Sequence, residues 1–257
     1  MKVVILAGGY GTRLSEETGT KPKPMVDIGG IPIIMHIMRY FMSFGHNEFV
    51  ICLGYKGEVI KDYFTNYQHN NSDFTIDSNS EITIHKKNKD YFKVTLVDTG
   101  LNTNTAGRIK KIKKYTENKP FFMTYGDGVS NIDLNELLSF HAKNNTIATL
   151  TSVKNTSSFG NLIIESDGVV SSFKEKEDLH ESWINAGYFV LEQEIFNYLN
   201  LDDIDEIQWE HDPLTNISKD KELSAFKHFG FWKAMDKLSD KVLLEKIWNT
   251  DSIPWKK

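Results

Sequence analysis

The chain has 257 residues, of which 40% are hydrophobic and 25% are charged, and its formal net charge is −5. This length and apolar content suffice for the core of one large domain or of two small ones. The acidic balance argues against nucleic acid as a partner, because the single basic run, residues 110–114, is typical of a solvated helix face. No apolar run reaches the roughly 18 residues of a membrane span, and residues 1–25 lack a secretory signal pattern. We therefore expect a cytoplasmic protein with no membrane partner.

Residues 1–25 predict a buried strand that leads into a glycine-rich loop. Residues 3–7 are continuously apolar, which is typical of a strand buried on both faces. The glycines in residues 8–11 let the backbone approach a ligand and turn its N–H groups toward phosphate oxygens, which Arg13 can bind in two places. A plain tight turn is the alternative. A second basic stretch, residues 21–25, favours a polyphosphate site, because two prolines restrict the backbone around Lys23.

The common nucleotide fingerprints do not fit this loop. A dinucleotide-binding loop needs glycine where Leu14 stands, and a P-loop needs Gly-Lys-Ser/Thr at residues 13–15, which are Arg-Leu-Ser. The sequence therefore argues against a nicotinamide-dependent oxidoreductase.

The elements after the loop predict alternating helices and strands. Residues 33–42 have helical spacing of apolar side chains, residues 49–53 form a second apolar strand, and residues 59–64 predict another helix. This alternation favours an α/β, Rossmann-like fold, with a mostly parallel central sheet flanked by helices and a nucleotide site at the carboxyl ends of the strands. Cys52 is the only cysteine, and as a small buried hydrophobe it fits a reducing compartment.

Short β-branched runs between residues 73 and 98 predict hairpin insertions and one further strand of the sheet. A helix follows that begins near Thr103 and contains Arg108. Small polar residues and an arginine at a helix N-terminus can recognise an anion or a base. From the residues alone, an ordinary helix cap is an equally good interpretation.

Asp127 is a candidate metal ligand. Residues 121–125 predict another buried strand, and the aspartate follows it between Gly126 and Gly128. A carboxylate flanked by glycines at the end of a strand can reach a bound ion, and Mg²⁺ prefers one or two carboxylates together with phosphate oxygens. The alternative is a turn, which Asp and Gly both favour.

The second half of the chain predicts an acceptor site. Strands are expected at residues 148–153, 159–164 and 169–173, and the mixed charges at residues 174–176 end the last of them. Glu175 can accept hydrogen bonds from hydroxyl groups, and Lys176 can pair with a phosphate. A solvated strand end is the alternative interpretation.

The motif LAGGYGTRL at residues 6–14, followed by KPKPM at residues 21–25, resembles the signature of the sugar-1-phosphate nucleotidylyltransferases. Within that family, SEET at residues 15–18 and TYGDG at residues 124–128 are most similar to the members that use CTP and glucose 1-phosphate. The likeness extends from Met1 to about Trp255. It implies one nucleotidyltransferase domain, with a nucleotide-binding half at 1–130 and a sugar-phosphate-binding half at 131–257, whose C-terminal part also serves oligomerisation.

The resemblance also implies the site residues. Arg13 and Lys23 would be catalytic, and Asp127 and Asp236 would bind Mg²⁺. The nucleotide would contact Leu6, Ala7, Gly8, Gly9, Gly11, Thr12, Arg13, Thr103, Arg108 and Gly126. The sugar phosphate would contact Gly128, Glu175, Lys176, Asn185, Gly187 and Glu210.

The implied reaction is Mg²⁺-dependent transfer of a cytidylyl group from CTP to α-D-glucose 1-phosphate, which gives CDP-glucose and pyrophosphate. The CDP-glucose would serve surface polysaccharide synthesis, and the resemblance implies that the enzyme is a homo-oligomer. Glu177 stands where the family has proline after Glu-Lys, and its added negative charge keeps another phosphate-monoester acceptor open. A nucleoside triphosphate other than CTP is a second alternative for the donor, because backbone contacts that recognise a base leave no side-chain signature in the sequence. A nucleotide-sensing module without turnover is the third alternative.

Overall fold

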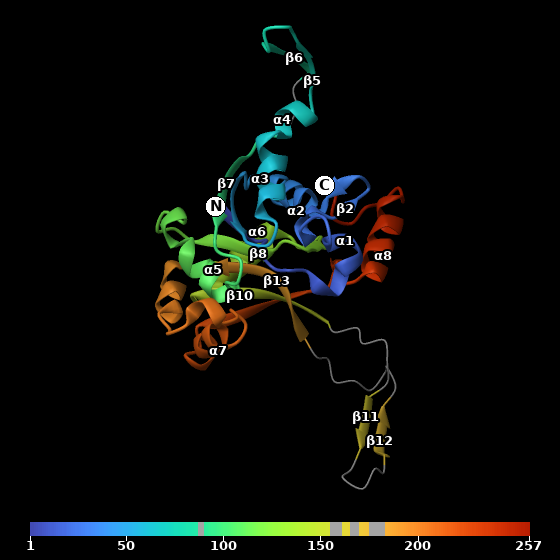
Figure 1. The fold of residues 1–257 in the computed structure, drawn as a ribbon. Helices are drawn as coiled ribbons and strands as arrows, with labels where there is room; N and C mark the ends of the chain where they lie inside the picture. Colours follow the sequence, from blue (N-terminus) through green and yellow to red (C-terminus); the bar gives the residue numbers. More distant parts are fainter. Residues whose placement is uncertain (87–89, 155–160, 165–169, 175–182) are drawn as a thin grey trace.

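The computed structural model describes residues 1–86, 90–154, 161–164, 170–174 and 183–257, with the backbone alone for 161–164 and 170–174. Its centre is a seven-stranded sheet in the order β14-β10-β13-β8-β1-β4-β7 (Figure 1). Every strand of this sheet runs in one direction except β13, which is antiparallel to both of its neighbours. The bounds are β1 Lys2–Leu6, β4 Glu48–Leu53, β7 Lys93–Asp98, β8 Phe121–Tyr125, β10 Ala148–Lys154, β13 Trp183–Leu191 and β14 Leu223–His228.

Helices cover both faces of this sheet (Figure 1). The α-helices are α1 Ser15–Thr18, α2 Ile33–Met42, α3 Gly57–Thr65, α4 Tyr67–Asn70, α5 Thr105–Lys111, α6 Leu134–Asn144, α7 Asp212–Lys219 and α8 Leu238–Trp248. The 3₁₀-helices are η1 Thr12–Leu14, η2 Lys23–Met25, η3 Lys113–Tyr115, η5 Gln193–Leu199 and η6 Ile204–Glu206. None of the helices in the described residues is long and apolar enough to cross a membrane.

The core consists of two apolar layers, one on each face of the sheet. Val3 and Ile5 of β1 pack in the layer that includes α2, α6 and α8, whereas Val4 and Leu6 pack in the layer that includes α5 and α7. Alternate residues of a strand point to opposite faces, so a strand covered on both sides is apolar throughout. The predicted α/β fold with a mostly parallel sheet is confirmed.

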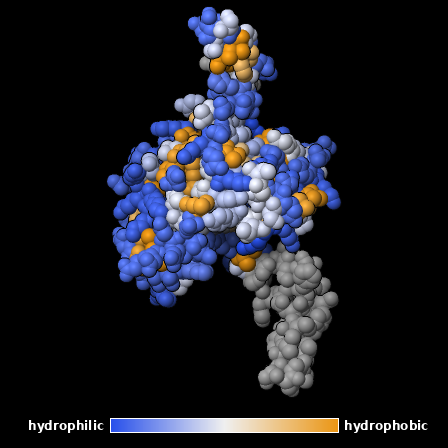
Figure 2. Space-filling view, viewed as in Figure 1, coloured by the Kyte–Doolittle hydropathy of each residue, from blue (hydrophilic) through white to orange (hydrophobic). Residues whose placement is uncertain are grey.

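Four two-stranded sheets are added to this framework: β2 Asp27–Ile28 with β3 Ile31–Pro32, β5 Asp73–Ile76 with β6 Ile82–Lys86, β9 Gly128–Ser130 with β15 Trp232–Ala234, and β11 Asn161–Ile164 with β12 Val170–Lys174. The β5–β6 hairpin projects from the body of the molecule (Figure 1). Phe74, Ile76 and Ile82 are exposed on it, and Figure 2 shows the hydrophobic surface at this arm.

Candidate active site

The site lies where β1 and β8 end side by side. The register pairs Leu6 with Tyr125, so the loop after β1 and the loop after β8 leave the sheet together. Between them and the loop after β7 lies a cavity of about 510 Å³. Its lining includes every residue predicted to bind the nucleotide, namely Leu6, Ala7, Gly8, Gly9, Gly11, Thr12, Arg13, Thr103, Arg108 and Gly126. The structure therefore brings these residues together at one cavity, and their contacts with a nucleotide stay a prediction.

The charged groups of the cavity centre on Lys23. Its ammonium lies 2.6 Å from Oδ2 of Asp127 and 2.7 Å from Oδ1 of Asp236. Burial would lower the pKa of Lys23, but the two carboxylates outweigh that effect and raise the pKa above its ordinary value. Nη1 of Arg13 lies 3.6 Å from Oδ2 of Asp236, and the Arg13 side chain is 79% exposed. Arg13 is therefore free to turn toward an incoming anion.

Pairing of β9 with β15 brings the two aspartates together across the sequence. The register places Gly128 opposite Ala234, and the N–H of Met235 donates to the carbonyl of Asp127 at 2.9 Å. Asp127 and Asp236 therefore leave adjacent strand ends. Such a long-range pair of short strands could not be deduced from local sequence patterns.

Asp240 holds the turn that carries Asp236. Its buried carboxylate accepts hydrogen bonds from the N–H groups of Asp236 and Lys237, both at 3.0 Å, and from Nζ of Lys233 at 2.6 Å. Burial would raise the pKa of Asp240, but these donors lower it below its usual value. Sequence reasoning missed this residue, although an aspartate at the third position of a helix is a known capping signal.

The two carboxylates fit a divalent cation of the kind that accompanies nucleotides. Oxygens of Asp127 and Asp236 already converge on one cation, the ammonium of Lys23. The described residues contain no group of three or more His, Cys, Asp or Glu side chains that could hold a metal ion. An ion at this place would thus take two carboxylate oxygens and complete its coordination with phosphate oxygens, which is the arrangement that Mg²⁺ prefers.

Three acceptor candidates, Asn185, Gly187 and Glu210, gather around Tyr125, which sequence reasoning missed. The Tyr125 hydroxyl donates to Oε1 of Glu210, and Asn185 also forms a side-chain hydrogen bond with it. Burial and the Glu210 carboxylate raise the pKa of Tyr125 well above its usual value, so the hydroxyl stays protonated. A Cβ atom at Gly187 would lie 2.4 Å from the Tyr125 ring, so this glycine makes room for it. The ring lines the cavity, and its position directly before Gly126 was the available signal.

Gly128 is the remaining acceptor candidate that the structure describes. Gly128 is in β9, and its carbonyl accepts a hydrogen bond from the Tyr188 hydroxyl at 2.9 Å. Glu175, Lys176 and the neighbouring Glu177 lie outside the described residues. Their predicted role toward a sugar phosphate stays a prediction.

A hydrogen bond spans the mouth of the cavity. The hydroxyl of Tyr10, on the glycine-rich loop, donates to Oδ1 of Asn102 at 2.7 Å, and both residues line the cavity. Tyr10 is 45% exposed, and its ring lies 5.2 Å from that of Tyr55. The two loops therefore meet at the surface. Sequence reasoning assigned neither Tyr10 nor Asn102.

The similarity of the chain to known proteins agrees with this geometry. The chain is 46% identical to the glucose-1-phosphate cytidylyltransferase of Salmonella typhi, over 100% of this chain and 99% of that protein. It is 42% identical to the probable glucose-1-phosphate cytidylyltransferase of Bacillus subtilis, with the same coverage. Among solved structures, HddC from Yersinia pseudotuberculosis superposes with a TM-score of 0.68 at 25% identity, covering 96% of this chain and 99% of that one. A UDP-glucose pyrophosphorylase complexed with UDP-glucose shares the fold, with a TM-score of 0.69 at 20% identity. That superposition covers 96% of this chain and 97% of the other.

The sequence model of the family described as nucleotidyl transferase matches residues 2–233. That match covers most of the chain, including the glycine-rich loop, Lys23 and Asp127. Together with the full-length similarity to the two cytidylyltransferases, it confirms the resemblance that the motifs indicate. The chain belongs to the nucleotidyl transferase family.

Proposed function

We propose that the protein transfers the cytidylyl group of CTP to α-D-glucose 1-phosphate, releasing pyrophosphate and giving CDP-glucose, with Mg²⁺ as the metal. The convergence of Lys23 with Asp127 and Asp236 beside a glycine-lined cavity carries this proposal. The names and full-length coverage of the two cytidylyltransferase relatives support cytosine as the base and glucose 1-phosphate as the acceptor.

The proposed chemistry is in-line displacement at the α-phosphorus. An acceptor phosphate is already largely ionised at neutral pH, so the protein supplies neither a nucleophile nor a general base. The obstacle is the repulsion between two anions, which positioned positive charge overcomes. A Mg²⁺ ion held by Asp127 and Asp236 would supply positive charge that neutralises the triphosphate.

The side chains divide this work by position. Lys23, which is only 14% exposed in its side chain, is fixed at the two carboxylates and would place its charge between the α-phosphate and the acceptor phosphate. Arg13 lies at the exposed rim and would neutralise the leaving pyrophosphate. Asp127 and Asp236 would hold the metal. The cluster around Tyr125 would face the acceptor.

The test is pyrophosphate release by the purified protein with Mg²⁺, α-glucose 1-phosphate and each common nucleoside triphosphate in turn. Release with CTP alone, dependent on the sugar phosphate, is the expected result. Release with another nucleotide would contradict the choice of base but not the chemistry. If the protein binds a nucleotide but releases no pyrophosphate with any phosphate monoester in a full panel of acceptors, it is instead a nucleotide-sensing module.

We also propose that the protein is a homo-oligomer in the cytoplasm. The exposed apolar side chains of the β5–β6 arm support association, because a two-stranded hairpin without a packing partner is only marginally stable. Phe74, Ile76 and Ile82 lie on one face of it, since Ile76 pairs with Ile82 and Phe74 is two residues away. Sedimentation of wild type and of Phe74→Ser with Ile76→Ser tests this proposal, which a wild-type monomer would contradict.

A further inference from the structure

The short helix α1 carries the motif SEET and does not line the cavity. Its last residue, Thr18, donates from Oγ1 to the carbonyl of Gly11 at 3.2 Å and to that of Leu14 at 3.0 Å. The Leu14 side chain is fully buried, so it fixes this part of the chain to the core. Residues 11–18 therefore form one compact unit, called here the loop unit, and Arg13 belongs to it.

A second compact unit, called here the turn unit, consists of residues 236–241 at the start of α8. The N–H of Asp236 donates to Oδ2 of Asp240 at 3.0 Å. The N–H of Lys241, one turn into the helix, donates to the carbonyl of Lys237 at 3.3 Å. The first turn of α8 thus holds Asp236 and Lys241 in fixed positions relative to each other.

An ion pair joins the loop unit to the turn unit. Nζ of Lys241 donates to Oε1 of Glu17, and α1 and α8 lie beside each other (Figure 1). The two side chains are 22% and 23% exposed, so water and salt screen this pair less than a pair on the open surface. A cation in the first turn of a helix is unfavourable for the helix dipole, and the contact with Glu17 offsets that effect. The ion pair therefore explains why a lysine stands at this position.

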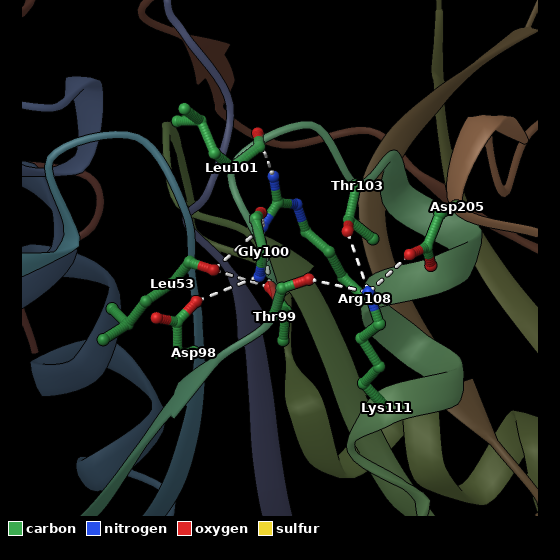
Figure 3. Close-up of polar contacts among 9 residues, drawn as sticks. All are labelled: Leu53, Asp98, Thr99, Gly100, Leu101, Thr103, Arg108, Lys111 and Asp205. Atoms are coloured by element: carbon green, nitrogen blue, oxygen red, sulfur yellow. Dashed lines mark hydrogen bonds and ion pairs between the residues drawn. The ribbon is translucent and has the colours of Figure 1, made fainter.

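One wall of the cavity, the loop after β7, is held by hydrogen bonds of two cationic side chains on α5 (Figure 3). Nζ of Lys111 donates to the Thr99 carbonyl at 3.1 Å, to Oγ1 of Thr103 at 2.9 Å and to Oδ2 of Asp205 at 2.6 Å. Arg108 donates to Oγ1 of Thr99 at 2.6 Å. This wall does not depend on any one of these contacts.

The loop unit has fewer charged contacts with the turn unit. In the part of the chain that the structure describes, two ion pairs connect these units, namely Glu17 with Lys241 and Arg13 with Asp236. The second pair is long, at 3.6 Å, and the Arg13 side chain is 79% exposed, so it contributes little. Glu17 and Lys241 therefore form the stronger of the two connections, and a single substitution can remove it.

We propose that Glu17 and Lys241 are positioning residues that set the distance between the Arg13 backbone and Asp236. In the proposed reaction Arg13 neutralises the leaving pyrophosphate and Asp236 holds the metal, so this distance decides whether one magnesium pyrophosphate reaches both residues. Neither Glu17 nor Lys241 lines the cavity, so the pair acts through the two units that it joins. The inference rests on the proposed function for the identity of the leaving group.

The first experiment measures the affinity for magnesium pyrophosphate by calorimetry in Lys241→Ala and Glu17→Ala. The first substitution removes a positive charge and the second a negative one, so a change in the electrostatic field alone would shift the two affinities in opposite directions. Loss of positioning should weaken binding about threefold to tenfold in both variants. The double variant should lose no more than either single one, because both substitutions remove the same contact. Opposite shifts, additive losses or unchanged affinities would each overturn the proposal.

Titration with Mn²⁺ in the absence of nucleotide separates positioning from damage to the metal site. Asp240 still holds the turn at Asp236 in both variants, so the Mn²⁺ affinity should stay within about twofold of wild type. A loss of Mn²⁺ affinity equal to the loss of pyrophosphate affinity would show that the turn itself is disrupted, and would overturn the proposal. The matched controls are Glu16→Ala and Lys246→Ala, at exposed positions of the same two helices, which should bind both probes as wild type does.

The connection itself can be measured without any ligand, by hydrogen exchange of residues 11–18. Exchange should be faster in Lys241→Ala than in wild type and in Lys246→Ala, because α1 loses its ion pair with α8. Unchanged exchange would overturn the proposal, whatever the enzyme proves to do. A wild type that binds no magnesium pyrophosphate would instead contradict the proposed function, and the exchange measurement would still decide whether the ion pair holds the loop unit.

Discussion

Replacing Lys23 by alanine tests the centre of the site most directly. The ammonium donates to Asp127 at 2.6 Å and to Asp236 at 2.7 Å, so it neutralises two carboxylates at once. Losing a preorganised charge of this kind lowers kcat by about 100- to 1000-fold. The same substitution leaves both carboxylates without their cation, and that second consequence has its own measurable effect.

Lys23 competes with a metal ion for the same oxygens. In wild type, a divalent cation must displace at least one charge-assisted hydrogen bond, which contributes about 1.5–3 kcal/mol in a buried setting. Asp236 is 46% exposed, so its bond to Lys23 contributes at the low end of this range or below it. Without the ammonium, Mn²⁺ should bind about tenfold to a hundredfold more tightly in the absence of nucleotide. The variant thus loses turnover while it gains metal affinity.

The assays are pyrophosphate release for turnover and Mn²⁺ titration by electron paramagnetic resonance for metal affinity. Lys21→Ala is the matched control, because Lys21 lies in the same basic stretch but pairs with Asp27 at 2.5 Å and does not line the cavity. Near-normal turnover in Lys23→Ala would remove this residue from the mechanism. Unchanged Mn²⁺ affinity would refute the assignment of Asp127 and Asp236 as the metal site.

Four further substitutions separate chemistry from stability. Arg13→Ala should lose about 100- to 1000-fold in kcat with no change in Tm, because its side chain is 79% exposed; near-normal turnover would remove it from the site. Asp240→Asn should weaken the turn that holds Asp236. The pKa of Asp240 is lower in the folded protein than in the unfolded chain, where it is about 4. Its carboxylate therefore stabilises the fold above that pH, and this stabilisation is lost as pH falls through the folded-state pKa. Urea unfolding should accordingly show a lower stability for Asp240→Asn than for wild type at pH 7, and no difference at the lowest pH. Gly9→Ala should keep its Tm and lose nucleotide affinity in a binding titration, because a Cβ atom at Gly9 would meet nothing within 4 Å. Gly8→Ala should lower Tm without any ligand, because a Cβ atom at Gly8 would lie 2.1 Å from Nη1 of Arg108; the reverse pattern would contradict this packing.

Much of the fold could be predicted because its signals are local. The continuous apolar run of residues 3–7 predicts a strand covered on both faces, and β1 packs alternately into the two apolar layers. The β-branched runs after residue 73 predict a hairpin and a further strand, which are β5–β6 and β7. Each of these depends on periodicity within a few residues, and the sequence contains that information directly.

The arrangement of partners could not be predicted in the same way. Nothing in residues 183–191 shows that β13 inserts between β10 and β8 against the direction of the sheet. The pairing of β9 with β15, which brings Asp236 to Asp127, joins segments about a hundred residues apart. Side-chain alternation determines which face of a strand is buried, but it does not identify the neighbouring strand. The convergence of the two aspartates therefore needed either the family resemblance or the structure.

The three glycines of the glycine-rich loop are required for different reasons, although the sequence motif treats them alike. Gly11 has φ of +65°, a conformation that favours glycine, and a Cβ atom at Gly8 would overlap the Arg108 guanidinium. The fold of the empty protein thus accounts for both residues. Gly9 is exposed, has no positive φ, and a Cβ atom there would meet nothing within 4 Å. The protein itself places no demand on Gly9, so any requirement for glycine at this position must come from a ligand that approaches the backbone. Of the three glycines, Gly9 therefore reports most directly on the nucleotide.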